Sequence, residues 1–422
     1  MAEPKVRFKK DDGSDYPTWE RYSVSDLFTK ISTKNKDGNN SNVITNSAEF
    51  GLIPQRDYFD KDIAVAGNTS NYTIIQTGDF VYNPRKSSNA PMGPFNCYRL
   101  FDDGIVSPLY SCLRPKGVLN SEYLLWYFQT DKWYGYVNDH GAQNGARHDR
   151  VGMTDKILMG IPVTAPCEEE QLKITDFLFS VDEVITISEK EVANLETQKK
   201  AVMKKIFSQE VRFKNADGGD FSEWEEHHFE NVFDCLNNNT FSRDMLNYTA
   251  GPALNIHYGD ILVKYGEVCD VRSDKIPFVS EGINVSKYAC LRDGDIIIAD
   301  TAEDEAVGKA VEIIGVGQST VISGLHTIVC RPKQAYSPRF LGYYMNSSEF
   351  HDQLKPLMQG VKVTSIGKKA ISTISIICPS SLEEQRLIAD FLSDFDEAIA
   401  AAKKELELWK ELKKGLLQQM FV

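Results

Sequence analysis

The sequence repeats itself, and this repeat restricts the possible folds more than any other feature. Val6-Arg7-Phe8-Lys9 returns as Val211-Arg212-Phe213-Lys214, and Trp19-Glu20 returns as Trp224-Glu225, in both cases 205 positions later. A constant offset across separate segments of mixed composition is typical of a duplicated unit rather than of chance. The chain is therefore predicted to contain two copies of one structural unit.

A second match closes each copy. Glu169-Glu170-Gln171 and Asp176-Phe177-Leu178 return 214 positions later as Glu383-Glu384-Gln385 and Asp390-Phe391-Leu392. Between these ends the similarity is weak, although Gly78-Asp79 still corresponds to Gly294-Asp295. Matching ends with dissimilar residues between them are expected where the scaffold of a domain is kept while its binding surface changes. The alternative is that the two copies drifted apart without functional consequence.

The closing segments, 166–210 and 380–422, carry the signature of long helices. Pro166 opens the first segment and Pro379 immediately precedes the second. Acidic residues fill the first turns, and Glu, Lys and Gln cover most other positions. Steps of three and four separate the apolar residues, which are Val181, Ile185, Val192, Leu195, Val202 and Ile206 in one copy and Phe395, Ile399, Ala402, Leu406, Trp409, Leu412, Leu416 and Met420 in the other. We expect the two stripes to pack antiparallel within the chain and to hold the globular parts at opposite ends; a coiled coil between molecules is the alternative.

The remaining segments, 1–165 and 211–379, indicate β-rich globular domains. Short β-branched or aromatic runs follow Gly-Asp turns at Gly78-Asp79, Gly259-Asp260 and Gly294-Asp295. Helical stretches occur only occasionally between them. The predicted fold class is α+β, with two β-rich globular domains joined by two long antiparallel coiled-coil helices in an internal pseudo-twofold repeat. The predicted division is 1–165, 166–210, 211–379 and 380–422.

Charge and cysteine content limit the kinds of partner. The 422 residues carry a net charge of −13, which counts against a broad basic surface for nucleic acid. Residues 1–165, however, hold 19 basic and 19 acidic side chains, so the acidic excess lies elsewhere. No apolar run reaches the roughly 20 residues that a membrane helix needs. The eight cysteines form no Cys-x-x-Cys pair, which favours reduced thiols and a cytoplasmic location.

Motifs for catalysis are absent from the sequence. It contains no phosphate-binding loop, no His-Glu-x-x-His zinc motif and no dinucleotide fingerprint. Asp295, Asp300 and Glu303, with Lys309 nearby, could form the magnesium site of a nuclease. The simpler interpretation is a solvated acidic loop that follows a strand. We therefore predict a chain without catalytic activity, with a standalone nuclease as one alternative.

Loops rich in amide and basic side chains are better candidates for function. Arg suits guanine, and Asn and Gln suit adenine, in the major groove. Two of these loops, 143–150 and 359–369, occupy equivalent places before the long helices. The predicted DNA-contacting residues are Arg85, Lys86, Gln143, Asn144, Arg147 and Arg150 in the first domain, and Arg243, Gln359, Lys362, Thr364 and Lys368 in the second.

Over nearly its whole length the chain resembles the specificity subunits of type I restriction–modification enzymes. The resemblance rests on the Trp-Glu start of each domain, on Tyr82-Asn83-Pro84-Arg85, on the segment from Gly104 to Tyr110, on Gly294-Asp295, and on the Glu-Glu-Gln helix starts with their Lys-Lys…Phe ends. It implies two target recognition domains that each read half of a split DNA site, with the paired helices as a ruler.

The resemblance also implies partners and cofactors. Two methyltransferase subunits would bring S-adenosylmethionine, and two translocase–nuclease subunits would bring ATP and magnesium, while this chain would hold no cofactor and no metal. The methyltransferases would supply many phosphate contacts, which explains how a chain with a net negative charge could take part in DNA binding. The other alternative is a coiled-coil assembly protein whose two domains bind proteins or glycans.

Overall fold

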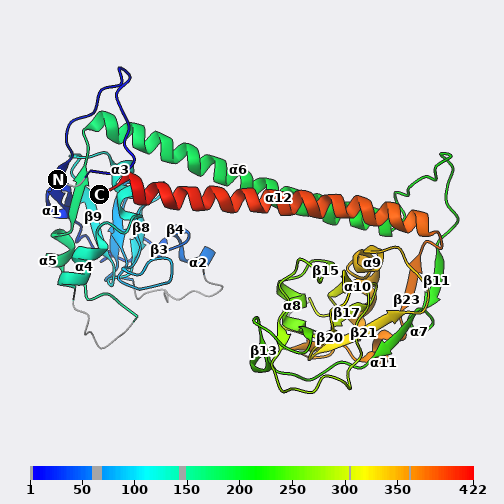
Figure 1. Cartoon of the computed structure of the whole chain (residues 1–422). Helices are drawn as coiled ribbons and strands as arrows, with labels where there is room; N and C mark the ends of the chain where they lie inside the picture. The colour runs from blue at the N-terminus through cyan, green and yellow to red at the C-terminus, as the bar shows by residue number, and fades with distance from the viewer. Residues whose placement is uncertain (1–2, 59–68, 142–148, 304–305, 361–362) are drawn as a thin grey trace. The chain divides into compact units, whose positions relative to one another are not determined.

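The fold is that of a computed structural model, in which two compact units can be distinguished (Figure 1). The structure describes residues 3–58, 69–141, 149–303, 306–360 and 363–422. The first unit comprises Met1–Glu189 with Lys404–Val422, and the second comprises Lys190–Lys403. Among the described residues, no helix combines the length and the apolar character that a bilayer crossing requires.

The described residues of the first unit form three small sheets. Their strand orders are β2-β9-β6-β7, β4-β3-β8-β5 and β1-β10. The strands are β1 Glu20–Ser23, β2 Phe28–Lys30, β3 Val43–Ser47, β4 Gly51–Pro54, β5 Thr73–Ile75, β6 Phe80–Tyr82, β7 Phe95–Cys97, β8 Gly104–Val106, β9 Ser111–Pro115 and β10 Pro162–Ala165. The short helices are α1 Val24–Leu27, α2 Gln55–Tyr58, α3 Ser121–Phe128, α4 Tyr134–His140 and α5 Asp155–Met159.

The second unit repeats this plan with additions. Its sheets have the orders β12-β21-β17-β19-β15, β13-β16-β14-β20, β11-β23 and β18-β22. The strands are β11 Glu225–His228, β12 Phe233–Leu236, β13 Leu246–Asn247, β14 Leu254–Ile256, β15 Val268–Asp270, β16 Phe278–Val279, β17 Ile296–Ala299, β18 Thr301–Ala302, β19 Ala310–Ile314, β20 Val321–Ser323, β21 Thr327–Pro332, β22 Thr364–Ser365 and β23 Ser375–Cys378. The short helices are α7 Phe229–Val232, η1 Arg243–Met245, α8 Tyr258–Val263, α9 Phe340–Met345, α10 Ser348–Leu354, η2 Lys355–Leu357 and α11 Lys368–Ile371.

Equivalent strands make equivalent pairs in the two units. The antiparallel pair β1–β10 before the long helix corresponds to β11–β23. The order β2-β9-β6 corresponds to β12-β21-β17, and the parallel pair β3–β8 corresponds to β14–β20. The predicted duplication is therefore visible in the topology, although little sequence similarity survives inside the domains.

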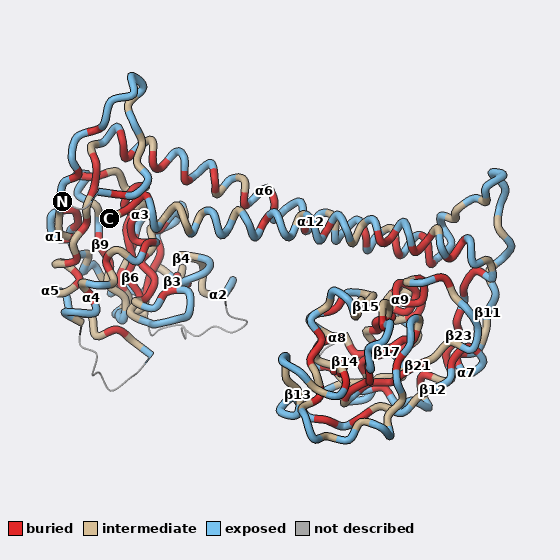
Figure 2. Tube along the Cα trace, in the orientation of Figure 1, coloured by how far each residue is buried: buried red, intermediate tan, exposed pale blue. Residues whose placement is uncertain are grey.

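Two long helices complete the fold, as the sequence predicts. Helix α6 runs over Glu168–Phe207 and α12 over Leu382–Met420, each beginning with acidic residues where the helix dipole favours them. Figure 2 shows buried positions recurring along both helices between exposed ones. Val181 and Ile185 of α6 and Ile399 and Leu406 of α12 are among these buried positions, all within the predicted stripes.

The helices pair with each other inside each unit, and their direction follows from ion pairs. In the first unit, Lys413 binds Asp182 (2.6 Å) and Lys410 binds Glu189 (2.9 Å). In the second unit, Lys403 binds Glu196 and Lys199 binds Asp396, both at 2.6 Å. From one ion pair to the next, the residue number on α6 increases while the residue number on α12 decreases, so the two helices are antiparallel. The predicted α+β fold with antiparallel helices in one chain is confirmed, although Leu412 of the predicted stripe is exposed rather than buried.

The predicted four-part division, with boundaries at 165, 210 and 379, stays a prediction. The compact units divide differently, because each takes part of both long helices into its own packing.

A buried ion pair anchors the start of each long helix. Glu170 of α6 accepts two hydrogen bonds from the guanidinium of Arg7, at 2.9 and 3.0 Å, and its side chain is fully buried. Glu384 of α12 accepts the same pair of bonds from Arg212, at 3.1 and 3.0 Å, and is also fully buried. Bidentate geometry satisfies the buried carboxylate and strengthens the contact. This explains why Val-Arg-Phe-Lys and Glu-Glu-Gln recur together.

The glutamine that follows each buried glutamate joins the helix to its globular domain. The side chain of Gln171 donates to Pro166 O (2.8 Å) and accepts from Asn120 N (2.9 Å). Gln385 repeats both bonds with Pro379 O (2.8 Å) and Ser337 N (2.9 Å). The Pro…Glu-Glu-Gln pattern therefore encodes a fixed junction between domain and helix.

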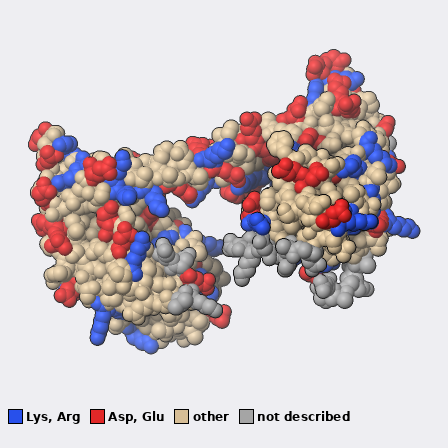
Figure 3. Space-filling model, turned by 180° about the vertical axis from the view of Figure 1, so that it is seen from behind, with Lys and Arg blue, Asp and Glu red and all other residues tan. Residues whose placement is uncertain are grey.

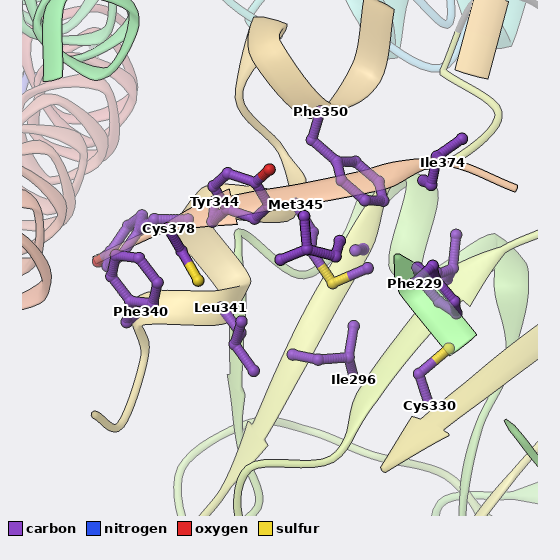
Figure 4. Close-up of a cluster of buried hydrophobic side chains, with 14 of the residues drawn as sticks. Phe229, Ile296, Cys330, Phe340, Leu341, Tyr344, Met345, Phe350, Ile374 and Cys378 are labelled. Atoms are coloured by element: carbon purple, nitrogen blue, oxygen red, sulfur yellow. The ribbon is translucent and has the colours of Figure 1, made fainter. Parts of the chain in front are cut away.

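The hydrophobic cores include residues from both long helices. In the first unit, Ile174 and Leu178 of α6 pack in the domain core together with Met420 and Phe421 near the end of the chain. In the second unit, the core contains Ile206 and Phe207 of α6 and Ile388, Ala389 and Leu392 of α12. Figure 4 shows part of this second core, where Phe340, Tyr344 and Phe350 surround aliphatic side chains. Each domain core is thus completed by helix ends that are distant in sequence.

Replacing Glu384 with Ala should lower the free energy of unfolding of the second unit by about 3 kcal/mol, because Arg212 would lose its partner beside a buried site. Urea denaturation followed by circular dichroism measures this change. The matched control is Glu383→Ala, which removes the adjacent exposed carboxylate and should change the free energy by less than about 0.5 kcal/mol. Equal effects of the two substitutions would contradict the anchoring role.

Candidate nucleic-acid interface

Two loops that the sequence singles out come together in the first unit. The segment after β6 runs alongside the end of the loop that precedes α5. Val151 N donates to Pro84 O (2.8 Å), Lys86 N donates to Asp149 O (2.9 Å), and Arg85 and Arg150 form an antiparallel bridge. Residues more than sixty positions apart therefore share one surface.

A buried amide network holds the first of these loops in place. Asn83 is buried, accepts from Arg85 N (3.0 Å) and donates to Asn46 O (3.1 Å). Asn46 in turn donates to Val81 O (2.7 Å) and accepts from the side chain of Asn96 (2.7 Å). Buried polar groups that are satisfied by one another fix a single backbone path.

Gly93 allows the loop to close on itself. It has a left-handed φ of +81°, and a Cβ there would lie 2.1 Å from Asn83 O. Only glycine tolerates both conditions. The loop after β6 is therefore a fixed platform for Arg85 and Lys86.

The predicted contact residues of the first domain divide into two groups. Arg85 and Lys86 are exposed and Arg150 is half-buried, and the structure brings the three together. Gln143, Asn144 and Arg147 lie outside the described residues. All six stay predictions as DNA contacts.

The second unit builds the same arrangement from different side chains. Strand β18 pairs with β22, so that Thr301 is opposite Ser365 and Ala302 is opposite Thr364. Ile366 N donates to Asp300 O (2.8 Å), which corresponds to the bond from Val151 N to Pro84 O. Thr301 therefore occupies the place of Arg85.

Sequence reasoning missed Thr301, although a signal was present. The offset of 216 between Gly78-Asp79 and Gly294-Asp295, carried forward, places Arg85 opposite Thr301. The side chain changes from the cation of Arg85 to the small hydroxyl of Thr301, so a pattern of basic and amide residues does not include Thr301.

His326 was missed as well, and no pattern in the sequence marks it. Its Nδ1 lies 3.3 Å from the hydroxyl of Thr301 and 3.3 Å from a carboxylate oxygen of Asp300, while its ring meets that of Tyr258 edge to face at 5.2 Å. His326 has a φ of 53°, a left-handed conformation that non-glycine residues adopt rarely. Thr301, His326 and Tyr258 thus form a polar and aromatic cluster on the second unit.

Arg243 belongs to the neighbourhood of this cluster but is already paired. Its guanidinium donates to both carboxylate oxygens of Asp260, at 2.8 and 2.9 Å, and these hydrogen bonds raise the pKa of Arg243. Burial and the charge of Arg243 lower the pKa of His257, the residue before Tyr258. The neutral His257 accepts from Gly259 N (3.2 Å) through its Nδ1. Arg243 is therefore tied to α8, the helix that begins at Tyr258, as well as contributing charge.

The other predicted residues of the second domain lie around the β18–β22 pair. Gln359 is exposed and bridges to Ser365, and Thr364 is half-buried within β22. Lys368 is exposed at the start of α11 and donates to Leu236 O (3.4 Å). Lys362 lies outside the described residues. These four assignments and that of Arg243 remain predictions.

The surface charge on one face of each unit is mixed. On the face shown in Figure 3, Lys and Arg side chains alternate with Asp and Glu, and neither sign gathers into a continuous patch. Such a surface gives little of the sequence-independent attraction to phosphates on which DNA affinity depends. Strong binding would need cations from another molecule.

Asp295, the first of the acidic residues considered for a nuclease, has a structural role. Asp295 is buried and accepts two hydrogen bonds from the guanidinium of Arg331, at 2.8 and 2.6 Å. Asp79 and Arg114 form the same pair in the first unit, with both bonds at 2.8 Å. Lys309 donates to Tyr265 O (2.7 Å) rather than to a carboxylate. Within the described ranges, no group of three or more His, Cys, Asp or Glu residues could hold a metal ion.

Comparison with known proteins gives this geometry a family context. Residues 222–408 match the family model of the type I restriction modification DNA specificity domain. Two specificity subunits from Methanocaldococcus jannaschii are similar, those of the type I restriction enzymes MjaX (26% identity over 222 residues) and MjaVIII (25% identity over 323 residues). The chain is related to type I restriction–modification specificity subunits. The resemblance that the sequence suggested is thereby confirmed.

The extent of the similarity differs between these relatives. The MjaX match covers 51% of this chain and 49% of that protein, so the chain spans only about half of that relative's length; the MjaVIII match covers 74% and 72%. A solved structure concerned with complex assembly and conformational transition of the type I R-M system covers 96% of this chain and 98% of its own, with a TM-score of 0.60 and 17% identity. At that identity the structural likeness shows the fold alone.

Replacing Asp295 with Ala should lower the free energy of unfolding of the second unit by about 3 kcal/mol, because Arg331 would be left unpaired at the sheet. Urea denaturation measures the loss, and Asp300→Ala, which removes a nearby but more accessible carboxylate, serves as the control with a change of about 1 kcal/mol or less. A gain in stability on losing Asp295 would indicate relief of repulsion between carboxylates, and with it a site built for a cation.

Proposed function

We propose that this chain is the DNA-sequence specificity subunit of a type I restriction–modification complex, in which each globular domain reads one half of a bipartite site. One observation carries the proposal: the segments 84–86 and 300–302 occupy equivalent places, pair with equivalent loops and differ in side-chain chemistry. A duplicated frame with two different reading surfaces suits recognition of two different half-sites. The family match over 222–408 supports the same function.

The side chains suggest how the two half-sites are read. In the first domain, Arg85 and Arg150 suit guanine edges, and Lys86 suits a phosphate. In the second domain, Thr301, His326 and Gln359 offer hydrogen-bond donors and acceptors, of which Gln359 suits adenine. Because the two sets differ, one protein chain would recognise an asymmetric sequence.

The acidic balance of the chain supports a role inside a larger complex. With a net charge of −13, it needs a partner to supply phosphate contacts. Two methyltransferase subunits would do so and would bring S-adenosylmethionine. Two translocase–nuclease subunits, with ATP and magnesium, would complete a restriction complex. This chain would be non-catalytic and would act in the cytoplasm, together with the DNA that the complex recognises.

The long helices would set the distance between the half-sites. Helix α6 has 40 residues and α12 has 39, so each is about 60 Å long at roughly 1.5 Å per residue. Paired antiparallel helices resist bending more than a single chain does. The spacer between the half-sites would therefore be fixed by helix length.

Arg85→Ala should weaken recognition at one position of one half-site by about 1–3 kcal/mol, roughly 5- to 150-fold, and leave the other half-site unchanged. His326→Ala should affect only the opposite half. Both are measured by sequencing the methylated sites in cells that carry the chain and its methyltransferase. Arg21→Ala, an exposed arginine of β1, is the control and should leave the motif intact. Identical methylation patterns in all three variants would refute the assigned surface.

Insertion of seven residues into each long helix, at matching places, should lengthen the spacer. Seven residues keep the apolar stripe in register and add about 10 Å, or roughly three base pairs. The methylated motif reveals the new spacing, and insertion into α6 alone should abolish methylation because the two paired helices would then differ in length by about two turns. An unchanged spacer in the double insertion would reject the helices as a ruler while leaving recognition by the domains intact.

A further inference from the structure

Two cysteines in the second unit face each other across neighbouring strands. Cys235 of the edge strand β12 and Cys330 of β21 are direct partners in the antiparallel register. All the cysteines of the chain are present as free thiols. The spacing of 95 residues between the two gives no hint of this pairing in the sequence.

The hydrogen-bonding pattern shows which kind of register pair they form. Lys333 N donates to Val232 O (2.8 Å), and bonded pairs alternate with non-bonded pairs along an antiparallel ladder. Counting from that bond, Cys235 and Cys330 form a non-hydrogen-bonded pair. In such pairs the Cα atoms are about 4.5 Å apart and the side chains are closest. This spacing lies within the range that a disulfide spans.

The two thiols have different surroundings. Cys235 is exposed at the sheet edge, whereas Cys330 is fully buried in the hydrophobic core drawn in Figure 4. A hydrogen bond from the Cys330 thiol, together with the charges of Lys368 and Lys333, lowers the pKa of Cys235 to about 6 despite its partial burial and the nearby Asp234. Burial raises the pKa of Cys330 well above its usual value. An accessible thiolate therefore stands beside a protected thiol.

We propose that Cys235 and Cys330 form an oxidation site, in which Cys235 reacts first with a peroxide and Cys330 then closes a cross-strand disulfide. The thiolate of Cys235 attacks one oxygen of hydrogen peroxide, the O–O bond breaks, and the departing hydroxide takes a proton to become water. Sulfur is thereby oxidised to a sulfenic acid. Sulfur of Cys330 then attacks the sulfenic sulfur, the S–O bond breaks, and the hydroxide leaves as water with the Cys330 proton. Two thiols lose two hydrogens and one peroxide becomes two waters.

The site differs from a solitary reactive cysteine. A sulfenic acid without a neighbouring thiol would persist or oxidise further. Here the thiol of Cys330, in direct register, can react with the sulfenic acid of Cys235 before further oxidation. The disulfide would tie the edge strand β12 to β21 just before the segment that leads to Arg243. The inference concerns chemistry of the chain itself and does not rest on the proposed function.

Peptide mapping of the full chain after treatment with hydrogen peroxide at pH 7 tests the proposal. Trypsin places Cys235 alone in residues 215–243 and Cys330 alone in 310–333, since Arg331 precedes a proline. We expect these two peptides to be joined, to weigh two hydrogens less than their sum, and to separate on reduction. Cys290→Ser, which removes another exposed cysteine, should give the same joined peptides.

The variants and the pH dependence sharpen the test. In Cys330→Ala, Cys235 should accumulate as a sulfenic acid that dimedone traps, and Cys235→Ser should give no joined peptide. Alkylation of Cys235 by iodoacetamide should rise through pH 6 and level off by pH 7, whereas an ordinary thiol continues to gain reactivity above pH 8. Over-oxidation of Cys235 without a joined peptide in the wild-type chain, or its pairing with any other cysteine, would overturn the proposal.

Discussion

Everything in this fold depends on a charged pair that is taken out of water at the start of each long helix. Glu170 and Glu384 are fully buried, and each is satisfied by an arginine from the first strand-like segment of its own copy. A buried carboxylate without that arginine would be strongly unfavourable, so the segment before each domain must return to the helix that follows it. The contact between that segment and the helix encloses the globular domain, which lies between them in the sequence, and it fixes where the helix begins.

With its ends fixed, each domain presents its loops in a reproducible place. The Asp–Arg pairs Asp79–Arg114 and Asp295–Arg331 lie at the start of equivalent strands, and the segments beyond those strands meet the loops at 149–151 and 364–366. The frame is held by buried charges and glutamine bonds, which tolerate little substitution. The loops carry exposed side chains, which can change at small cost in stability. A scaffold of this kind can acquire new specificity without losing its fold.

The sequence predicted the parts of the fold that rest on short-range or repeated patterns. The helices followed from apolar spacing, and the matching offsets of 205 and 214 revealed the duplication. Arg85, Lys86 and Arg150, which the structure brings together, were also among the predicted contact residues, because basic residues in loops are conspicuous. Thr301 and His326 were not, since a hydroxyl and a lone histidine carry no chemical signature until a neighbouring loop brings them within 3.3 Å. Arg243 was identified by its charge, but its pairing with Asp260 depends on a contact that sequence spacing does not encode.

What the sequence determined by itself is the plan: two copies of one unit, each closed by an amphipathic helix. Periodicity and repetition are local or one-dimensional properties, so they can be read without coordinates. What only the tertiary structure decided is which side chains meet, including the two loops of each surface and the facing cysteines of β12 and β21. Those contacts join residues from 62 to 95 positions apart, and their geometry depends on strand register and core packing, which arise only when the whole domain has folded.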